Sequence, residues 1–130
     1  MDIKITGTKG YIVESLLPYL KKKFVHDTVS AISVRNKELD LVGTDVLIHV
    51  AGLVPGRTKD NSEYYRVNYE LTVELAELAK KAGVRHFIYF STIAVYGRSP
   101  SFHGKLGFQE GTEKPVTPYG DSKLMAEKAL

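Results

Sequence analysis

Residues 3–20 read IKITGTKGYIVESLLPYL, and this stretch decides the class of fold. A short apolar strand over Ile3–Thr6 runs directly into a glycine-rich turn, after which Ile12, Leu16 and Leu20 recur at helical spacing. A strand that ends in such a turn and opens a helix brings free backbone N–H groups and the positive end of the helix dipole together. The stretch therefore predicts an α/β domain with an anion site suited to a pyrophosphate.

The glycine pattern departs from the usual dinucleotide-binding motif. Gly7 and Gly10 are present, but Val13 stands where a third glycine normally lets the helix pack closely on the strand. By itself the motif is weak, and a plain strand-to-helix turn stays open as an alternative. Pro18 falls inside the helical pattern and removes one backbone hydrogen bond, which predicts a kink or an early end of the helix nearby.

The segment Thr28–Val34 is rich in β-branched residues and predicts a second strand. The acidic residue that normally follows this strand and binds the adenosine ribose is missing, and Arg35 stands at that position. An arginine there could bind a 2′-phosphate and favour NADP, stack on adenine, or face water. Only about ten residues separate Arg35 from the next strand, so the usual extra strand and helix have no room and the domain is reduced.

The next strand, Asp45–Val50, is a nearly continuous apolar run of the kind buried on both faces of a sheet. It ends in Ala51, Gly52 and Leu53, small or apolar residues that let a flat ligand approach the backbone. His49 is a lone histidine in this run, and we interpret it as a hydrogen-bonded packing residue rather than a catalytic one. The other histidines show no ligand spacing, so no metal site is predicted.

Residues 61–82 predict a long helix that Asn61 or Ser62 can cap and that Gly83 ends. Asn68 falls in the apolar stripe of this helix. A buried amide is unfavourable unless its hydrogen bonds are made. Asn68 is therefore a bridge to a neighbouring loop, part of a site, or both.

A strand over His86–Phe90 leads directly into Ser91 and Thr92. The carboxyl end of a strand in a parallel sheet lies at the edge where ligands bind, which would place the Thr92 hydroxyl there. Taken alone, Thr92 fits a turn residue equally well.

The last stretch, Pro118–Leu130, predicts a helix that carries Tyr119 and Lys123 on one face, four residues apart. An ammonium near a phenol stabilises the phenolate and lowers its pKa towards the range of a general base. Tyr19 and Lys23 show the same spacing without a partner motif. We interpret Tyr19 as a half-buried aromatic residue and Lys23 as a solvated one.

Composition limits the class of protein. The 130 residues, 43% hydrophobic and 25% charged, suit one domain with a real core. The net charge of +3 is scattered, and Lys21–Lys23 and Lys80–Lys81 fit solvated helix ends, so no nucleic-acid partner is expected. The chain has no cysteine, which fits a cytoplasmic protein, and no apolar run approaches the roughly 18 residues of a membrane anchor.

In concert and in this order, the motifs resemble the N-terminal part of an extended short-chain dehydrogenase/reductase of the NAD-dependent epimerase/dehydratase family. The tail PYGDSKLMAE is most similar to that of the UDP-glucose 4-epimerases. The family's dehydratases carry an Asp-Glu pair after the strand-end hydroxyl, where this chain has Ile93 and Ala94, so dehydration is disfavoured. The motifs that carry the resemblance are TGxxGYI at residues 6–12, DVLIHVAG at 45–52, Asn68, STIAVYG at 91–97 and PYGxSK at 118–123.

The resemblance implies catalytic roles for three residues. Tyr119 would be the base towards the sugar 4-hydroxyl, Thr92 would hydrogen-bond the same oxygen, and Lys123 would hold the nicotinamide ribose and depress the Tyr119 pKa. The implied cofactor is NAD, with NADP left open by Arg35. The cofactor-binding residues implied are Gly7, Gly10, Tyr11, Ile12, Arg35, Ala51, Gly52, Leu53, Asn68, Ser91, Tyr119 and Lys123.

The expected fold is a three-layer, Rossmann-like, doubly wound parallel sheet, reduced and truncated, with about four strands in the order 2-1-3-4. Family members are considerably longer, so the resemblance implies an incomplete NAD(P)-binding domain over residues 1–130, without the C-terminal substrate domain and inactive alone. It also implies a nucleotide-sugar substrate and a homodimer through helices 61–82 and 118–130. The region 98–116 is expected to be a mobile loop.

Two alternatives to a nucleotide-sugar 4-epimerase stay open. One is an NADP-dependent reductase or dehydrogenase of the same fold, which Arg35 supports. The other is a non-catalytic dinucleotide-binding domain, which the degraded glycine motif supports.

Overall fold

A computed structural model describes residues 1–35, 39–98 and 111–130. The chain divides into two compact units. Unit 1 comprises Met1–Ala51 and Glu74–Phe90, and unit 2 comprises Gly52–Val73 and Ser91–Leu130. Most of the loop predicted at 98–116 lies outside the described residues. In the described ranges, no helix is long and apolar enough to cross a membrane.

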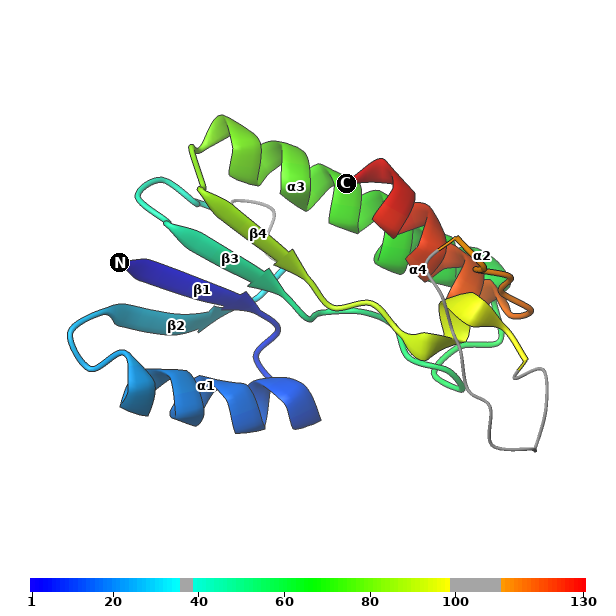
Figure 1. Cartoon of the computed structure of the whole chain (residues 1–130), viewed down its shortest axis with the longest axis horizontal. Coiled ribbons are helices and arrows are strands. Elements are labelled where there is room, and N and C mark those ends of the chain that lie inside the picture. Colours follow the sequence, from blue (N-terminus) through cyan, green and yellow to red (C-terminus); the bar gives the residue numbers. More distant parts are fainter. Residues whose placement is uncertain (36–38, 99–110) are drawn as a thin grey trace. The chain divides into compact units, whose positions relative to one another are not determined.

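Unit 1 is built on a four-stranded parallel sheet in the order β2-β1-β3-β4, as predicted (Figure 1). Ile3 of β1 lies opposite Val29 of β2 and Val46 of β3. Because all four strands are parallel, their carboxyl ends share one edge of the sheet. The strands are β1 (Asp2–Thr6), β2 (Thr28–Ile32), β3 (Val46–His49) and β4 (His86–Tyr89).

Helices pack on both faces of the sheet of unit 1 and leave part of β4 exposed. Helix α1 (Tyr11–Lys23) packs on one face, over a core formed by Ile3, Ile5, Val13, Leu20, Val29 and Ile48. The part of helix α3 (Leu71–Lys81) that belongs to unit 1 packs on the other face, around Leu41, Leu47 and Ala79. Leu47 and Ile48 are adjacent on β3 and enter opposite cores, since side chains alternate along a strand. Each such buried side chain contributes about 1.5–3 kcal/mol.

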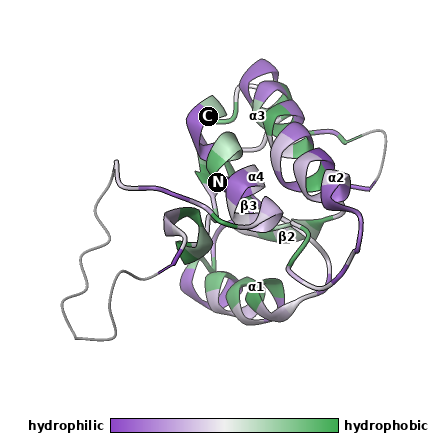
Figure 2. Cartoon of the chain, turned by 90° about the vertical axis from the view of Figure 1, so that its right-hand side faces the viewer, coloured by the Kyte–Doolittle hydropathy of each residue, from purple (hydrophilic) through white to green (hydrophobic). Residues whose placement is uncertain are grey.

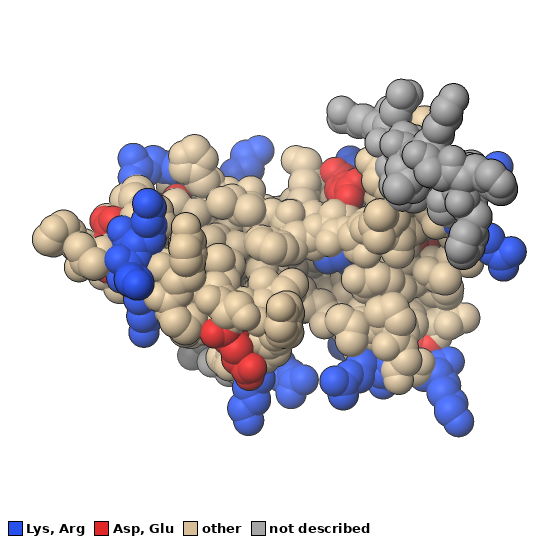
Figure 3. All heavy atoms as spheres, turned by 60° about the horizontal axis from the view of Figure 1, so that its bottom comes forward, with Lys and Arg blue, Asp and Glu red and all other residues tan. Residues whose placement is uncertain are grey.

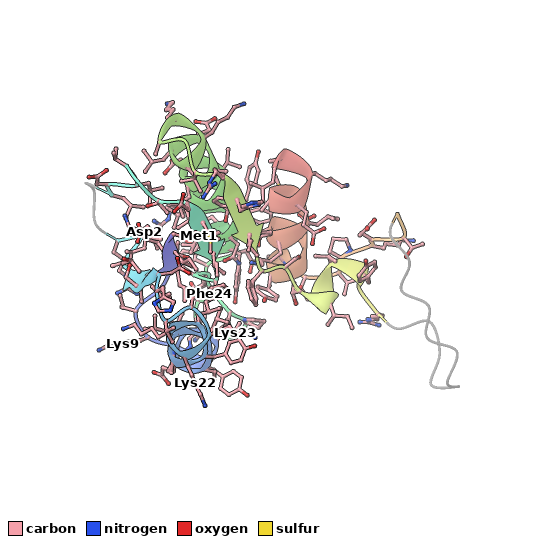
Figure 4. The ribbon with its side chains drawn as sticks, turned by 60° about the vertical axis from the view of Figure 1, so that its left-hand side comes forward. Met1, Asp2, Lys9, Lys22, Lys23 and Phe24 are labelled. Atoms are coloured by element: carbon pink, nitrogen blue, oxygen red, sulfur yellow. The ribbon has the colours of Figure 1, made fainter. Side chains whose placement is uncertain are left out.

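Helix α1 continues through Pro18 to Lys23, so of the two predicted outcomes the early end near Pro18 was wrong, and the kink stays a prediction. The proline removes one hydrogen bond, but Leu17 and Leu20 on either side pack into the core and hold the last turns. Lys22 lies in the last turn and points outward, where a cation interacts favourably with the helix dipole (Figure 4). Figure 2 shows both hydrophobic and hydrophilic residues along α1.

Tyr19 lies on the outer side of α1 with 61% of its surface exposed, so its prediction as a half-buried residue was wrong. The apolar stripe of the helix is supplied instead by Val13, Leu16, Leu17 and Leu20, and Tyr19 falls outside it.

The predicted long helix is one helical run made of three segments: α2 (Asn61–Tyr64), the π-helix η1 (Tyr65–Glu70) and α3. Its N-cap is Asp60 and neither Asn61 nor Ser62, because the Asp60 carboxylate accepts hydrogen bonds from both the N–H and the hydroxyl of Ser62. Gly83 ends the run as predicted, with φ at +78°.

Unit 2 contains α2, η1, the 3₁₀-helix η2 (Ile93–Tyr96) and helix α4 (Pro118–Ala129). Helix α4 begins with Thr117 as N-cap, whose hydroxyl accepts from the Gly120 N–H, and with Pro118 in the first turn. It packs against both η1 and η2. On the face drawn in Figure 3, Lys and Arg side chains lie in separate groups, which matches the scattered charge of the sequence.

Candidate functional site

The glycine turn of unit 1 joins β1 to α1 with both glycines at positive φ, +101° at Gly7 and +133° at Gly10. A side chain at either position would be strained, which explains the choice of glycine. Gly10 is the N-cap of α1, and no side chain caps the helix there. The amides of the first helical turn are thus left for an anion.

Val13 fits in place of a third glycine because Gly7 has no side chain. Val13 is 4% exposed, and a Cβ at Gly7 would lie 3.4 Å from Val13 Cγ2. The close approach of helix and strand that a third glycine usually permits is therefore possible here because a Val13 methyl group packs against the backbone of Gly7. The turn keeps its course with only two glycines.

A buried Thr6–His49 pair fixes the end of β3 beside the end of β1. The Thr6 hydroxyl oxygen accepts from the N–H groups of Val50 (3.2 Å) and Ala51 (3.1 Å), and it lies 2.7 Å from His49 Nδ1. With its lone pairs engaged, the hydroxyl donates its proton to Nδ1. His49 is fully buried, which confirms it as a hydrogen-bonded packing residue. No local pattern could predict this role of Thr6, because its partners are more than 40 positions away.

Arg35 follows β2 at the edge of the sheet where the strands end. Its side chain is exposed, and its N–H donates to the Ser33 hydroxyl over 3.3 Å. The preceding strand touches the glycine turn directly, since the Gly7 N–H donates to the Ile32 carbonyl over 2.8 Å. Arg35 is therefore three residues beyond the contact of β2 with Gly7, and residues 36–38 lie outside the described part of the chain.

In unit 2, Asn68 bridges η1 to the loop that follows β3. Its amide oxygen accepts from the Leu53 N–H over 2.7 Å, and its amide nitrogen donates to the Leu53 carbonyl over 3.0 Å. Asn68 is 1% exposed, so both predictions for it, a buried position and a structural bridge, are confirmed. A Cβ at Gly52 would lie 3.0 Å from the Asn68 amide oxygen. The small residue at position 52 is thus required by Asn68.

Helix α4 holds Tyr119 and Lys123. Lys123 is 6% exposed, and burial lowers its pKa from 10.5 to about 8, against the opposing effect of the Glu127 carboxylate. The Tyr119 ring is half-buried and meets the edge of the Tyr64 ring, with centroids 6.3 Å apart. Helix α4 thus presents a buried lysine one turn from a half-buried tyrosine.

Thr92 is the N-cap of η2, where its hydroxyl oxygen accepts from the Ala94 N–H over 3.2 Å. The turn role and the strand-end position predicted for Thr92 are therefore compatible. The adjacent Ser91 is exposed.

Gly120 brings the η2 segment against α4, a role that sequence patterns did not predict. A Cβ at Gly120 would lie only 2.4 Å from the Ala94 carbonyl oxygen. Thr92 is two residues before Ala94, and Tyr119 directly precedes Gly120. The close approach of these two backbones thus holds the Thr92 segment beside the start of the helix that carries Tyr119.

Replacing Gly120 with alanine is expected to lower the free energy of unfolding by about 1–3 kcal/mol, because the new methyl group overlaps the Ala94 carbonyl. Urea denaturation of the chain measures this change. Lys128→Ala, at an exposed position of the same helix, is the control. Alanine is the better helix former. A Gly120→Ala protein that is as stable as the wild type, or more stable, would therefore show that α4 does not pack closely against the Ala94 carbonyl.

The predicted site residues fall into two groups, each held within one unit. Unit 1 places the first group around the turn and the strand ends, and unit 2 places the second on η1, η2, α4 and the loop at Leu53. The first group is Gly7, Gly10, Tyr11, Ile12, Arg35 and Ala51, and the second is Gly52, Leu53, Asn68, Ser91, Thr92, Tyr119 and Lys123.

Curated relatives resemble the chain over most or all of its length. The UDP-glucose 4-epimerase of Streptococcus mutans is 34% identical over 100% of this chain and 37% of that protein. The UDP-glucose 4-epimerase of Schizosaccharomyces pombe is 31% identical over 98% of this chain and 33% of that protein. The chain therefore spans about a third of the length of these relatives.

Solved structures show the same fold. The structure of MoeE5 in complex with UDP-glucose and NAD matches with a TM-score of 0.82 and 25% identity, over 99% of this chain and 48% of that chain. The UDP-glucuronic acid 4-epimerase from Bacillus cereus, in complex with NAD, matches with a TM-score of 0.76 and 26% identity, over 99% and 51%. Residues 3–130 also match a family of sequences described as NAD dependent epimerase/dehydratase. With its sheet order, its motifs and this match in agreement, the chain belongs to the NAD dependent epimerase/dehydratase family.

Proposed function

We propose that this chain is the NAD-binding part of a nucleotide-sugar 4-epimerase of the UDP-glucose/UDP-galactose type. The observation that carries the proposal is the pairing on α4 of Tyr119 with Lys123, whose burial lowers its pKa to about 8. The UDP-glucose 4-epimerases among the relatives support the substrate class. The nucleotide and sugar would be held mainly by residues outside these 130.

Each unit by itself carries residues that would fit one part of NAD. In unit 1, the turn from Gly7 to Ile12 would hold the pyrophosphate, since α1 has no side-chain cap and a Cβ at Gly10 would meet nothing within 4 Å. In unit 2, Lys123 and Tyr119 would bind the nicotinamide ribose. The chemistry that bound NAD supplies is the reversible acceptance of a hydride from sugar C4.

The chain's own residues would move and hold one proton. Tyr119 would take the proton of the sugar 4-hydroxyl and return it after the sugar has turned, and Thr92 would hydrogen-bond the same oxygen. With a pKa of about 8, Lys123 is mostly protonated at neutral pH, so it would present a cation one helical turn from Tyr119. An ammonium already desolvated by burial acts on its neighbours with little screening.

Dehydration is disfavoured by the residues that follow Thr92. Ile93 and Ala94 stand where a dehydratase of this family needs an acid, and Ile93 is 68% exposed. No carboxyl group at these two positions can protonate a leaving hydroxyl.

A second candidate function is an NADP-dependent reductase or dehydrogenase, which the exposed Arg35 favours because a guanidinium suits a 2′-phosphate. The Arg35→Ser variant distinguishes this candidate function from the proposed epimerase. If NADP is the natural cofactor, this variant weakens NADP binding and leaves NAD binding unchanged. If the epimerase proposal holds, the retained cofactor is NAD in both proteins.

We also propose that a substrate domain packs on unit 1, because β4 is an edge strand and apolar surface lies beside it. Ile88 is 45% and Phe90 36% exposed. A shallow depression of about 380 Å³ is lined by Tyr11, Ile12, Ser15, Leu16, Tyr19 and Phe90. Exposed apolar surface of this kind is typical of a face that another element covers. The homodimer stays a prediction, which sedimentation of the native protein tests.

The proposed function is tested on the longest native polypeptide that contains these residues. We expect mass spectrometry of the denatured protein to find released NAD, and we expect interconversion of UDP-galactose and UDP-glucose without added reductant. A tightly held NAD is needed because the same cofactor molecule must return to the sugar the hydride that it accepts. Stoichiometric NADPH consumption with a ketone substrate, and no epimerisation, would contradict the proposal and favour the reductase.

A further inference from the structure

Asp121 and Ser122, two of the three residues between Tyr119 and Lys123, both contact the π-helix η1. The Tyr65 hydroxyl donates to the Asp121 carboxylate over 2.9 Å, and the Asn68 amide nitrogen lies 3.4 Å from the Ser122 hydroxyl oxygen. Residues 65 and 68 are three positions apart on η1, and 121 and 122 are consecutive on α4. Two contacts at adjacent positions resist rotation of α4 about its axis, which one contact alone would not do.

The Tyr65–Asp121 contact is the stronger of the two. The Asn68 amide already bonds both backbone groups of Leu53, and its 3.4 Å contact to Ser122 is long. The Tyr65–Asp121 bond is shorter and has a carboxylate as its acceptor, a group that forms strong hydrogen bonds. The bond to Asp121 raises the pKa of the Tyr65 phenol above its usual 10, so the donor proton stays in place at neutral and moderately alkaline pH.

Neighbouring contacts would transmit a movement of α4 to the candidate catalytic residues. Tyr64, next to Tyr65 in the chain, meets the edge of the Tyr119 ring. The Ser122 hydroxyl donates to the Tyr119 carbonyl over 2.9 Å. Any rotation of α4 against α2 and η1 therefore shifts the Tyr119 ring and changes the burial of Lys123. A π-helical segment inside a longer helix is also rare and is frequent at functional sites.

We propose that Tyr65 and Asp121 are positioning residues, whose hydrogen bond sets the rotation of α4 and thereby aims Tyr119 and Lys123 at the substrate. The inference rests on the proposed function for the identity of the reaction. The bond itself is a property of unit 2. Neither residue touches the reacting atoms, so each acts through the helix.

Four variants and one control test the bond in the longest native polypeptide: Tyr65→Phe, Asp121→Ala, Asp121→Asn, the double variant Tyr65→Phe/Asp121→Ala, and Tyr69→Phe. Tyr69 lies on the same π-helix, so its variant is the matched loss of a hydroxyl. We expect Tyr65→Phe and Asp121→Ala each to lower kcat by about tenfold to a hundredfold with little change in KM, since small misplacements reduce rate strongly. Asp121→Asn keeps an acceptor oxygen and retains most activity.

The double variant should be no slower than either single variant, because both remove the same bond. Two outcomes would overturn the proposal. In one, Tyr65→Phe behaves as Tyr69→Phe does. In the other, Asp121→Asn is as slow as Asp121→Ala, which would assign the effect to the charge of Asp121 and not to the bond that positions α4.

A second measurement needs no catalysis and separates this proposal from the proposed function. The Lys123 side chain of the 130-residue chain is titrated by NMR. Its signal is assigned as the one that is missing from the spectrum of the Lys123→Met variant. Tyr65→Phe should raise the Lys123 pKa from about 8 towards 10.5, as a rotated helix exposes the ammonium. If Tyr65→Phe lowers the stability of the protein but leaves the Lys123 pKa unchanged, the proposal that Tyr65 and Asp121 position α4 is overturned. If the wild-type enzyme fails to epimerise but this pKa moves, only the proposed function fails.

Discussion

Replacing Tyr119 with phenylalanine is expected to lower kcat for epimerisation by about two to four orders of magnitude, the usual contribution of a positioned acid or base. The substitution keeps the aromatic ring, so the edge contact with Tyr64 persists and only the hydroxyl is lost. We expect KM to change little, because the lost interaction matters mainly in the transition state. The measurement is steady-state conversion of UDP-galactose to UDP-glucose by the longest native polypeptide.

Tyr19→Phe is the matched control for Tyr119→Phe. Tyr19 shares the spacing of Tyr119 to a lysine four residues on, but it lies on the outer side of α1 with 61% of its surface exposed. We expect this variant to keep wild-type activity, because phenylalanine keeps the ring that lines the depression beside Phe90. Bound NAD is quantified in both variants, so that loss of cofactor is separated from loss of the base. Tyr119→Phe with wild-type kcat and full NAD content would favour a non-catalytic dinucleotide-binding domain.

Replacing Lys123 with methionine is expected to abolish activity and to raise the free energy of unfolding at pH 7 by up to about 3 kcal/mol. The lowering of the Lys123 pKa from 10.5 to about 8 is a burial effect on the charged form, and each pKa unit corresponds to about 1.4 kcal/mol. Methionine fills a similar volume without a charge to desolvate. Urea denaturation of the chain at a series of pH values measures the change.

The pH dependence of this effect follows from linkage. Between pH 8 and 10.5, the unfolded chain holds the Lys123 proton while the folded chain has released it, so the stability of the wild type rises with pH. The gain in the free energy of unfolding of Lys123→Met over the wild type should therefore be largest below pH 8 and shrink as the pH approaches 10.5. Lys128→Met, at an exposed position of the same helix, should show neither effect. The Lys123→Met protein could instead be less stable than the wild type at pH 7, with a stability difference that does not change at high pH. That result would mean that the contacts of the ammonium outweigh its desolvation.

Both predictions, and the proposed roles of η1, depend on features that sequence patterns reveal to different degrees. Asn68 was predicted to be buried because it interrupts an apolar stripe, and the structure confirms this. The π-helix around it was not predicted, since a six-residue change in helical hydrogen bonding leaves no clear mark on periodicity. Asp60 was missed as the cap because Asn61 and Ser62 are equally good capping types.

The sequence by itself determined the order of the strands, the glycine turn and the helix that carries Tyr119 and Lys123. These features follow from local patterns, namely strand and helix periodicity, residues that permit positive φ, and the fixed handedness of parallel crossovers. Only the tertiary structure decided that Gly120 rests on Ala94, that Lys123 is buried, and that Tyr65 bonds Asp121 across 56 positions. Such contacts join residues far apart in the chain, and their partners and distances depend on how the helices pack.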